Sequence, residues 1–397
     1  MRIVFAQNMI HLPAHGGANK SNRVLAELLA ARGHECHLVA PLGGVMRTSD
    51  QDPDTLWDRY GARLLGRDEA AVRYELGGVQ VHGVRSPSAL VKRVRSTIAE
   101  VRPDWVVVPS DDPGSMVLAA ALGAAPDRVV YLTYTIQQLP FGPSAFYPSA
   151  GGAALVRRAA GTLAISRAAQ RYVHDWAGIQ ADLLYPPVYG SIPEPRTDDG
   201  SGAITMVNPC GYKGLPIFLS LAETFPDLPF LAVPTWGTTA DDRAQLARRP
   251  NIEIAEPVDD IGLILRRTRM LVVPSLWDET FGFTCVDAML RGIPVLASAV
   301  GGLTEAKLDV PYLLPVRRIE SYDAAADRAR PVPVIPPQDT APWRDAVHRL
   351  LDDPAHRADV ADLSRAAAVS FVESLDEGAL EQYLASLEPA RVGARDA

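Results

Sequence analysis

The sequence predicts an α/β protein with two domains, each built on a doubly wound parallel sheet. Short, continuously apolar runs recur along the chain and alternate with stretches of helical periodicity. This is the pattern of strands that helices bury on both faces. At 397 residues the chain is long enough for two domains that each bury a core. The segment around 190–202 is rich in Pro, Asp and Gly, which is the composition of a linker between the two halves.

The first half of the chain should contain most of one sheet. An amphipathic helix is expected after the first strand and should end at Gly33, because glycine is a common helix stop. A basic helix is expected at 87–101. Residues 45–75 are polar without a firm period, so we expect an insertion or a mobile segment there. The strands predicted for this half are 3–6, 37–40, 79–84, 105–109, one beginning at 129, 162–166 and 183–187.

The second half should contain another parallel sheet. Residues 331–342 contain five prolines, which predicts an extended connection. The predicted strands are 203–207, 230–233, 252–255, 270–273, 294–297 and 312–314. The predicted helices include 259–269, one beginning near Phe283, 343–351, 355–372 and 376–387.

The composition argues against several classes of protein. A net charge of −8 argues against a dedicated nucleic-acid binder. Cys36, Cys210 and Cys285 have no metal or redox spacing, so we expect reduced thiols. No apolar run reaches the ~18 residues of a membrane span or fits a signal peptide, so we expect a cytoplasmic protein. The basic helix at 87–101 can lie on an anionic membrane, but its modest apolar face favours a solvated position.

Residues 270–305 contain the densest pattern in the chain. A buried strand leads into a loop with Glu279, and a helix with Asp287 follows before the next strand. Free backbone N–H groups at a helix N-terminus bind anions, and residues 281–284 would supply such groups. Two carboxylates beside a helix start also occur as surface charge, worth only about 0.3–1 kcal/mol each. The surrounding sequence favours the functional interpretation.

This stretch resembles the family 4 retaining glycosyltransferases, which have the GT-B fold of two Rossmann-like domains facing across a cleft. The resemblance rests on Pro-Ser-x-x-x-Glu-x-Phe-Gly, Asp-Ala-Met, Gly-x-Pro-Val and Gly-Gly-Leu-x-Glu, all within 274–305. It is strong over 203–305 and weaker before residue 200. The resemblance implies an acceptor-side domain at 1–195, a nucleotide-sugar donor domain at 203–375, and a C-terminal helix at 376–390 that crosses back to the first domain.

In this family a Glu-x7-Glu motif holds the donor, and here the motif reads Glu279-x7-Asp287. By resemblance, Glu279 is a catalytic residue that reaches the donor sugar, and Asp287 holds the ribose hydroxyls. Aspartate is one methylene, about 1.5 Å, shorter than glutamate, so the ribose site must tighten or use water. The backbone amides that the resemblance places on the diphosphate are those of Phe281, Gly282, Phe283 and Thr284.

Two further donor contacts follow from the same resemblance. The family often has Arg at the end of the strand 203–207 and Lys five residues later; here Asn208 replaces the Arg and Lys213 matches. One charge-assisted contact, worth about 1.5–3 kcal/mol, is therefore missing unless another group replaces it. Val258, in the loop after the strand 252–255, is implied to receive the nucleotide base through backbone groups.

The first half contributes four more candidates. Gly16 and Gly17, in the loop after the first strand, allow a phosphate to approach the backbone closely, and Lys20 follows them. The resemblance implies that this loop faces the donor phosphates, although Lys20 is equally well explained as a solvated residue at a helix start. Tyr134 occupies the place of a family His that contacts the transferred sugar; its hydroxyl can donate, but it cannot supply imidazole chemistry near pH 7. A core tyrosine is the alternative.

The predicted function is retaining transfer of a hexose-type sugar from a nucleotide diphosphate sugar to a hydroxyl of a small-molecule, glycan or lipid-linked acceptor. We expect no essential metal and no other cofactor, because Asp111-Asp112 does not form the Asp-x-Asp metal motif of the other glycosyltransferase fold. The absence of Gly-x-Gly-x-x-Gly argues against a nicotinamide dinucleotide. A non-catalytic nucleotide-sugar-binding protein is one alternative. A nucleotide-sugar epimerase of the GT-B type is the other, although the first half offers no convincing acid–base pair.

Overall fold

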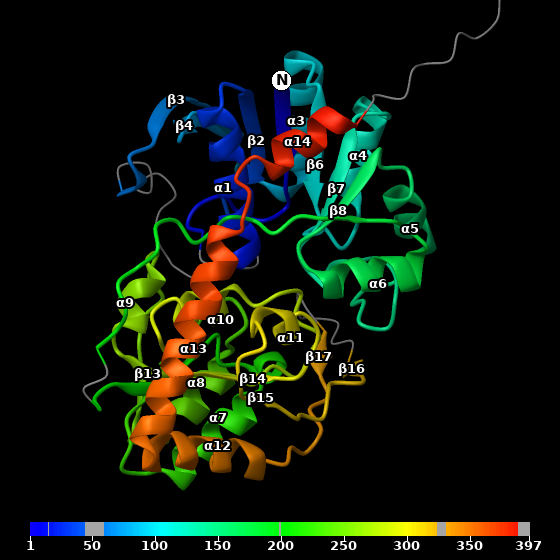
Figure 1. Ribbon diagram of the computed structural model, residues 1–397. Coiled ribbons are helices and arrows are strands. Elements are labelled where there is room, and N and C mark those ends of the chain that lie inside the picture. The colour runs from blue at the N-terminus through cyan, green and yellow to red at the C-terminus, as the bar shows by residue number, and fades with distance from the viewer. Residues whose placement is uncertain (15, 44–58, 198–199, 324–330, 388–397) are drawn as a thin grey trace, which may run out of the picture. The chain divides into compact units, whose positions relative to one another are not determined.

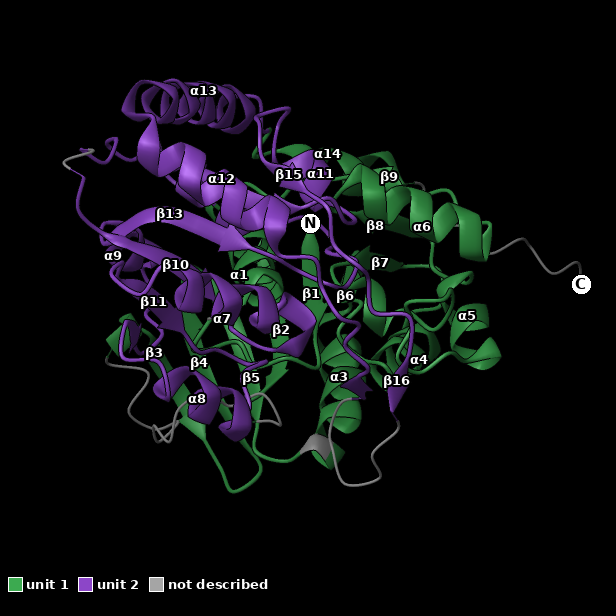
Figure 2. Cartoon of the chain, turned by 90° about the horizontal axis from the view of Figure 1, so that it is seen from below, with its two compact units in different colours: residues 1–188, 376–397 green, residues 189–375 purple. Residues whose placement is uncertain are grey.

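Two sheets organise the chain, one in each of two compact units. The structure is a computed structural model that describes residues 1–14, 16–43, 59–197, 200–323 and 331–387. The first unit is Met1–Val188 with Asp376–Ala397, and the second is Tyr189–Leu375 (Figure 2). Both units are α/β, with helices packed against a sheet whose central strands are parallel (Figure 1). The predicted α/β class is confirmed.

The sheet of unit 1 has the strand order β3-β4-β5-β2-β1-β6-β7-β8-β9. β1 pairs in parallel with both β2 and β6, so the chain winds outward from β1 in both directions. The point where the direction reverses lies between β1 and β6. The strands are β1 (Arg2–Ala6), β2 (Glu35–Pro41), β3 (Arg63–Arg67), β4 (Ala71–Leu76), β5 (Val79–Val84), β6 (Trp105–Pro109), β7 (Val129–Thr133), β8 (Gly161–Ala164) and β9 (Asp182–Leu183). The helices are α1 (Gly17–Ala31), α3 (Pro87–Val101), α4 (Met116–Ala124), the short η2 (Ile136–Gln138), α5 (Ala150–Val156), α6 (Arg167–Ala177) and α14 (Ala379–Ser386).

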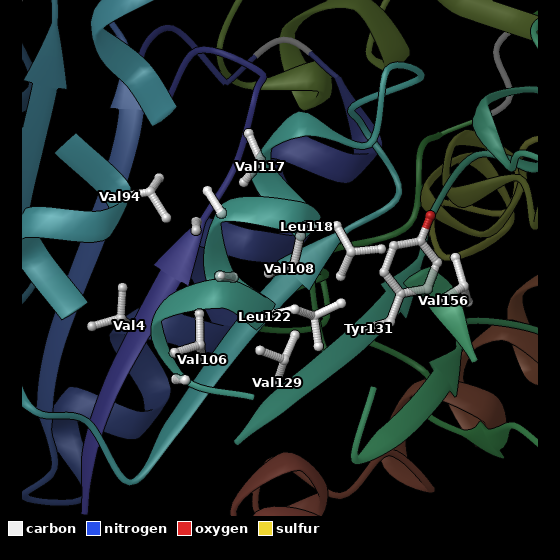
Figure 3. Close-up of a cluster of buried hydrophobic side chains, with 14 of the residues drawn as sticks. Val4, Val94, Val106, Val108, Val117, Leu118, Leu122, Val129, Tyr131 and Val156 are labelled. Atoms are coloured by element: carbon white, nitrogen blue, oxygen red, sulfur yellow. The ribbon is translucent and has the colours of Figure 1, made fainter. Parts of the chain in front are cut away.

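The main core of unit 1 lies between the central strands and helices α3, α4, α5 and α6; Figure 3 shows part of it. Val4 of β1 and Val106 of β6 lie close to Val94 of α3 and to the side chains of α4. α4 is apolar along almost its whole length because it contacts α3, α5 and β6. Burial of each large apolar side chain contributes about 1.5–3 kcal/mol, so this layer fixes the strands whose ends carry the polar groups described below.

The sheet of unit 2 is wholly parallel, with the order β12-β11-β10-β13-β14-β15. From β10 the chain adds strands toward one edge of the sheet, and from β13 it adds them toward the other edge, so the order of strands reverses between β10 and β13. The strands are β10 (Ala203–Val207), β11 (Phe230–Val233), β12 (Ile252–Ile254), β13 (Thr268–Val273), β14 (Val295–Ser298), β15 (Leu313–Leu314) and a separate pair, β16 (Tyr322–Asp323) and β17 (Val332–Pro333). The helices are η3 (Gly211–Lys213), α7 (Leu215–Thr224), α8 (Ala240–Ala247), α9 (Ile261–Leu265), α10 (Phe283–Met289), α11 (Leu303–Ala306), α12 (Ala341–Asp352) and α13 (Pro354–Glu373).

Two predictions of secondary structure need correction. The segment 45–75 was expected to be an insertion or mobile, but its described part forms β3 and most of β4, which extend the sheet as antiparallel strands; 44–58 lie outside the described residues. The helix predicted at 259–269 is shorter because Thr268 already belongs to β13, where its hydroxyl bonds the Thr205 hydroxyl at 2.8 Å. The extended segment after 331 begins in β17, which pairs with β16.

The C-terminal helix α14 belongs to unit 1 although α13, the preceding helix, belongs to unit 2. Glu381 of α14 lies 2.9 Å from His34 Nε2 and also approaches Arg32, at the end of α1. The Tyr383 hydroxyl lies against Gly161, where a β-carbon would overlap it. These contacts attach the end of the described chain to the first sheet.

Candidate active site

The candidate site lies at the reversal point of the sheet in unit 2. β10 and β13 are neighbours there and run parallel to each other. The segment after β10 contains Asn208 and Lys213, and the loop after β13 contains Glu279. Ligands of open α/β sheets bind outside the carboxyl ends of the strands at such a reversal. The topology therefore brings these three residues to the edge of the sheet where a ligand is expected.

A close backbone contact shapes the segment that carries Lys213. η3 ends at Gly214, which has a φ of +81°. A β-carbon on Gly214 would overlap the carbonyl of Pro274, the first residue after β13. Both the positive φ and the lack of space require glycine at this position. The two loops thus meet through their backbones, and Lys213 is held beside the loop that carries Glu279.

Lys213 and Glu279 form an ion pair at the centre of the site. Lys213 Nζ donates to Glu279 Oε1, and the Ser275 hydroxyl donates to the same oxygen. Their side chains are only 17% and 13% exposed. Burial pushes the pKa of Glu279 upward, but the charge of Lys213 and the hydrogen bonds from Lys213 and Ser275 outweigh burial, so the net pKa is lowered. Glu279 is therefore a carboxylate at neutral pH, with one cation in contact.

The backbone of Glu279 rests on the Gly301-Gly302 pair that follows β14. Gly302 N donates to Glu279 O at 2.7 Å. A β-carbon on Gly302 would overlap the carbonyl of Thr280. The Gly-Gly-Leu-x-Glu pattern of the sequence thus has a structural role, which is to let the next loop pack directly under the Glu279 peptide.

Two tryptophans flank the ion pair, and the sequence interpretation did not identify either of them as a site residue. Lys213 Nζ lies 4.5 Å from the centre of the Trp277 ring and 5.9 Å from that of Trp236. The two rings lie 5.8 Å apart. A cation over the face of an indole gains about 0.5–2 kcal/mol. Only their closeness to Glu279 in the sequence could have indicated site residues: Trp277 lies two residues before it and Ser275 lies four residues before it.

Asn208 positions a loop instead of supplying a charge. It directly follows β10 in a left-handed conformation with φ of +59°. Its Oδ1 accepts from Gly237 N at 2.9 Å, which ties the Trp236–Gly237 loop after β11 to the end of β10. Its Nδ2 is buried and has no hydrogen-bond partner among the residues that the structure describes. This donor is the one polar group that the side chain retains for further contact.

The segment 281–284 leads into α10, which begins at Phe283 after the cap residue Gly282. Phe281 is buried against Phe283 and Phe371, with ring centres 5.4 and 5.8 Å away, whereas Gly282, Phe283 and Thr284 are half-buried. The packing of the Phe281 side chain therefore fixes the backbone at the start of the segment 281–284.

Asp287 lies in α10 and is 8% exposed. The Cys285 thiol in the same helix interacts electrostatically with Lys307, Glu279, Lys213 and Asp287, and burial raises its pKa to about 12. Cys285 is therefore a neutral thiol at neutral pH. Val258 packs separately, against the cluster of Leu231, Val233 and Ile264. Its predicted contact with a base stays a prediction.

The candidates of unit 1 gather at the equivalent edge of the first sheet. α1 starts at Gly17 with Gly16 as its cap residue, so Gly17 and Lys20 lie in the first turn of the helix, not in the predicted loop. The Ser21 hydroxyl in this turn donates to Gly17 O at 2.7 Å. Tyr134 is buried after β7, and burial raises its pKa far above the usual value while the nearby Ser21 opposes the shift. Tyr134 and the start of α1 are thus neighbours, and the tyrosine keeps its proton at any physiological pH.

A buried carboxyl lies at the reversal point of unit 1. Asp111, just after β6, accepts from Asn8 N and Met9 N at 2.9–3.0 Å and so fixes the loop after β1. Burial raises its pKa to about 7, although these backbone donors and the adjacent Asp112 modify the shift. The sequence interpretation treated the two aspartates only as a failed metal motif. Both oxygens of Asp111 are used in holding the loop, which indicates a structural role.

In the parts of the chain that the structure describes, no three His, Cys, Asp or Glu side chains are grouped as metal ligands. The prediction that the reaction needs no metal stays a prediction.

The fold matches that of known glycosyltransferases. HepE of Anabaena, solved in complex with UDP and glucose, superposes with a TM-score of 0.65 at 17% identity, over 97% of this chain and 98% of that protein. WaaG, a glycosyltransferase involved in lipopolysaccharide biosynthesis, superposes with a TM-score of 0.58 at 12% identity, over 98% and 99%. At such low identity these similarities define the fold, which is GT-B.

Two family models assign the chain. Residues 15–188 match the model described as Glycosyltransferase Family 4, and residues 221–353 match the model described as Glycosyl transferases group 1. The chain belongs to the family 4, group 1 glycosyltransferases, as the sequence predicts.

Curated relatives match only part of the chain. An uncharacterised 42.6 kDa protein from the cps region of Klebsiella pneumoniae is 31% identical over 114 residues, which are 28% of this chain and 30% of that protein. The D-inositol 3-phosphate glycosyltransferase of Nocardia farcinica is 32% identical over 134 residues, which are 33% of this chain and 25% of the enzyme. The chain thus spans less than a third of the length of these relatives.

Proposed function

We propose that the protein is a retaining glycosyltransferase that moves a hexose-type sugar from a nucleotide diphosphate sugar to a hydroxyl acceptor. The observation that carries the proposal is the half-buried Lys213–Glu279 ion pair at the reversal point of the unit 2 sheet. A buried ion pair is weak evidence for stability, because desolvation offsets most of its attraction. A cation and a carboxylate at the ligand edge of the sheet instead suit a ligand with a diphosphate and hydroxyl groups.

The roles follow from charge and hydrogen bonding. Lys213 binds the diphosphate, and the N–H groups of 281–284 bind it with Lys213. Glu279 accepts from the hydroxyls of the donor sugar, and Asp287 accepts from those of the ribose. Asn208 donates through Nδ2, and the loop of Val258 receives the base. The donor-binding role implied for Gly16, Gly17 and Lys20 and the catalytic role implied for Tyr134, all in unit 1, stay predictions.

Transfer requires stabilisation of a leaving diphosphate, and preorganised donors can supply most of it. In our proposal the leaving diphosphate helps to accept the acceptor's proton on the same face of the sugar, which gives retention. Lys213 takes the place of a metal ion as the main positive charge on the diphosphate. Activity should therefore survive removal of divalent cations by a chelator.

UDP-sugars are the first donors to test, because HepE was solved with UDP and with UDP-glucose. A hydroxyl of a sugar, cyclitol or lipid-linked glycan is the first class of acceptor. No helix in the described parts of the chain has the length and hydropathy to cross a bilayer. The cytoplasmic location stays a prediction.

The test is product analysis. The protein is incubated with each sugar nucleotide and a panel of hydroxyl acceptors, and the new glycosidic bond is examined by proton NMR. The proposal expects a product with the anomeric configuration of the donor, no effect of EDTA, and loss of transfer in Glu279→Ala with nucleotide affinity within a few-fold of wild type. Tight nucleotide binding without any product would favour the binding-protein alternative, and a changed sugar on the nucleotide would favour an epimerase.

A further inference from the structure

The turn after β11 holds Trp236 in a fixed position. Thr238 N donates to Thr235 O at 3.2 Å, which closes the turn around the tryptophan. Gly237 N donates to Asn208 Oδ1 at 2.9 Å, and a β-carbon on Gly237 would overlap the Asn208 side chain. The turn is therefore packed directly against the residue that follows β10, so the backbone of Trp236 is fixed at the carboxyl edge of the sheet.

The Trp236 ring is a large aromatic group that the fold does not fully bury. Its centre lies 5.8 Å from that of Trp277 and 5.9 Å from Lys213 Nζ. Trp277 is 6% exposed, whereas Trp236 keeps part of its surface accessible. Lys213 already has the Trp277 ring at 4.5 Å, and 5.9 Å is close to the limit of about 6 Å for attraction between a cation and a ring. Packing and the contact with Lys213 therefore use only part of the Trp236 indole.

The order of the strands puts Trp236 on the nucleoside side of the proposed diphosphate site. The sheet has the order β12-β11-β10-β13 in this region. At its carboxyl edge Val258 follows β12, Trp236 follows β11, Lys213 follows β10 and Glu279 follows β13. In the proposed function the base lies at Val258 and the transferred sugar lies at Glu279. In the order of the strands, the indole thus lies between the loop for the base and the cation for the diphosphate.

The distances allow the base to reach the indole. A phosphate oxygen that is bonded to Lys213 Nζ lies about 2.8 Å from it, so the bound diphosphate begins within about 9 Å of the centre of the Trp236 ring. Only the ribose separates the base of a nucleoside diphosphate from its phosphates. Stacked aromatic rings have centres about 4.5–7 Å apart. A base can therefore stack on Trp236 while Lys213 holds the phosphates.

We propose that Trp236 stacks on the nucleobase of the donor and so contributes to the affinity of the site for nucleoside diphosphates. The inference rests on the proposed function, which puts the diphosphate at Lys213 and the base at Val258. An aromatic face accepts every base, because each base has a π-face. Trp236 thus supplies affinity without selecting the base, and the backbone groups near Val258 make the selection.

Two substitutions and a ligand without a base separate stacking from an effect on Lys213. Trp236→Leu removes the aromatic face, so the affinity for UDP, GDP, ADP and dTDP should fall about 5- to 150-fold, with the larger losses for the two purines. Trp236→Phe keeps a smaller face and should restore most of the affinity. Inorganic pyrophosphate has no base, so Trp236→Leu should change its affinity less than about twofold. Trp176→Leu is the matched control, because Trp176 is an exposed tryptophan in α6 of unit 1.

Calorimetry measures the affinities, and tryptophan fluorescence reports the stacking itself. A base that stacks on an indole quenches its emission, so a bound nucleotide should quench wild type and Trp176→Leu but not Trp236→Phe. The proposal is overturned by unchanged nucleotide affinity in Trp236→Leu, by an equal loss of affinity for pyrophosphate, or by a full quench in Trp236→Phe. The quench in Trp236→Phe decides the matter even if Trp236→Leu does not fold.

The same data separate this inference from the proposed function. A wild-type protein that binds none of the four nucleotides overturns both. Nucleotide affinity that depends on Trp236, in a protein that forms no glycoside, supports the stacking and counts against transfer. Transfer and nucleotide affinity that are unchanged in Trp236→Leu support the proposed function and remove Trp236 from the site.

Discussion

The ion pair of Lys213 and Glu279 predicts opposite effects of two substitutions on nucleotide binding. Lys213→Met removes the cation that we assign to the diphosphate, so binding should weaken. Glu279→Gln removes a negative charge beside the same diphosphate and frees Lys213 from its partner. Binding should then be unchanged or tighter, even though transfer should be lost. A purely structural ion pair would not produce this difference in sign.

The magnitudes follow from the structure. Loss of a charge-assisted contact costs about 1.5–3 kcal/mol, so Lys213→Met should bind about 10- to 150-fold more weakly. For Glu279→Gln, two unit charges about 6 Å apart interact by about 3 kcal/mol at an effective dielectric constant of about 20, which is an upper bound here. We therefore expect affinity between that of wild type and about tenfold tighter. The double variant should bind more weakly than Glu279→Gln alone.

Isothermal titration calorimetry at low salt with the best nucleoside diphosphate would measure these effects. Arg249→Met and Glu223→Gln form the matched control, since these residues make a surface ion pair in the same unit. Neither control should change affinity by more than about twofold. The reasoning is refuted if both Lys213→Met and Glu279→Gln weaken binding by the same factor, or if Lys213→Met binds like wild type.

Three other predictions concern stability and chemistry. Gly302→Ala should lower the free energy of unfolding by about 1–3 kcal/mol in chemical denaturation, because the added β-carbon would overlap the carbonyl of Thr280. Gly123→Ala is the control: this position is exposed in α4 and has open space, so the variant should be as stable as wild type or more stable. Lys307 is fully buried, and its Nζ donates to Val295 O at 2.7 Å. Burial lowers its pKa from 10.5 to about 8, so the folded protein binds fewer protons than the unfolded chain between those values and the wild type gains stability as the pH rises. Lys307→Met lacks this group, so the stability of the variant relative to wild type should fall by about 1–3 kcal/mol between pH 7 and pH 10.5. A constant difference across pH would contradict that assignment. Tyr134→Phe should lower turnover about 2- to 13-fold, the value of one neutral hydrogen bond, without shifting the pH profile, because the buried phenol stays protonated; unchanged turnover would place Tyr134 in the core only.

Most of the fold could be predicted because its strands are buried on both faces. Trp105–Pro109 of β6 and Met270–Val273 of β13 are continuously apolar runs, and such a run is stable mainly as a strand that is buried on both faces. β3 could not be predicted, because it is an edge strand with mostly exposed side chains and no alternation of hydrophobicity. Its pairing with β4 is a long-range property that local sequence does not carry.

The site was predictable where a residue type and a spacing together define the chemistry. Lys213 and Glu279 were found from a motif, and the structure puts them in contact. The roles of Ser275 and Trp277 depend on side-chain direction within a loop, which has no periodicity to read. Asp111 was missed for a related reason, because its partners are backbone N–H groups about 100 residues earlier in the chain.

The most direct test of the account is a thermal-shift panel of the wild-type protein and Lys213→Met with UDP, GDP, ADP and dTDP, in the presence of EDTA. A ligand at 100 times its dissociation constant adds about 2.7 kcal/mol to the free energy of unfolding, which is readily measured as a higher Tm. We predict that one nucleotide raises the Tm of wild type and that the rise is much smaller in Lys213→Met. No shift with any nucleotide, or an equal shift in both proteins, would contradict a metal-independent donor site at Lys213.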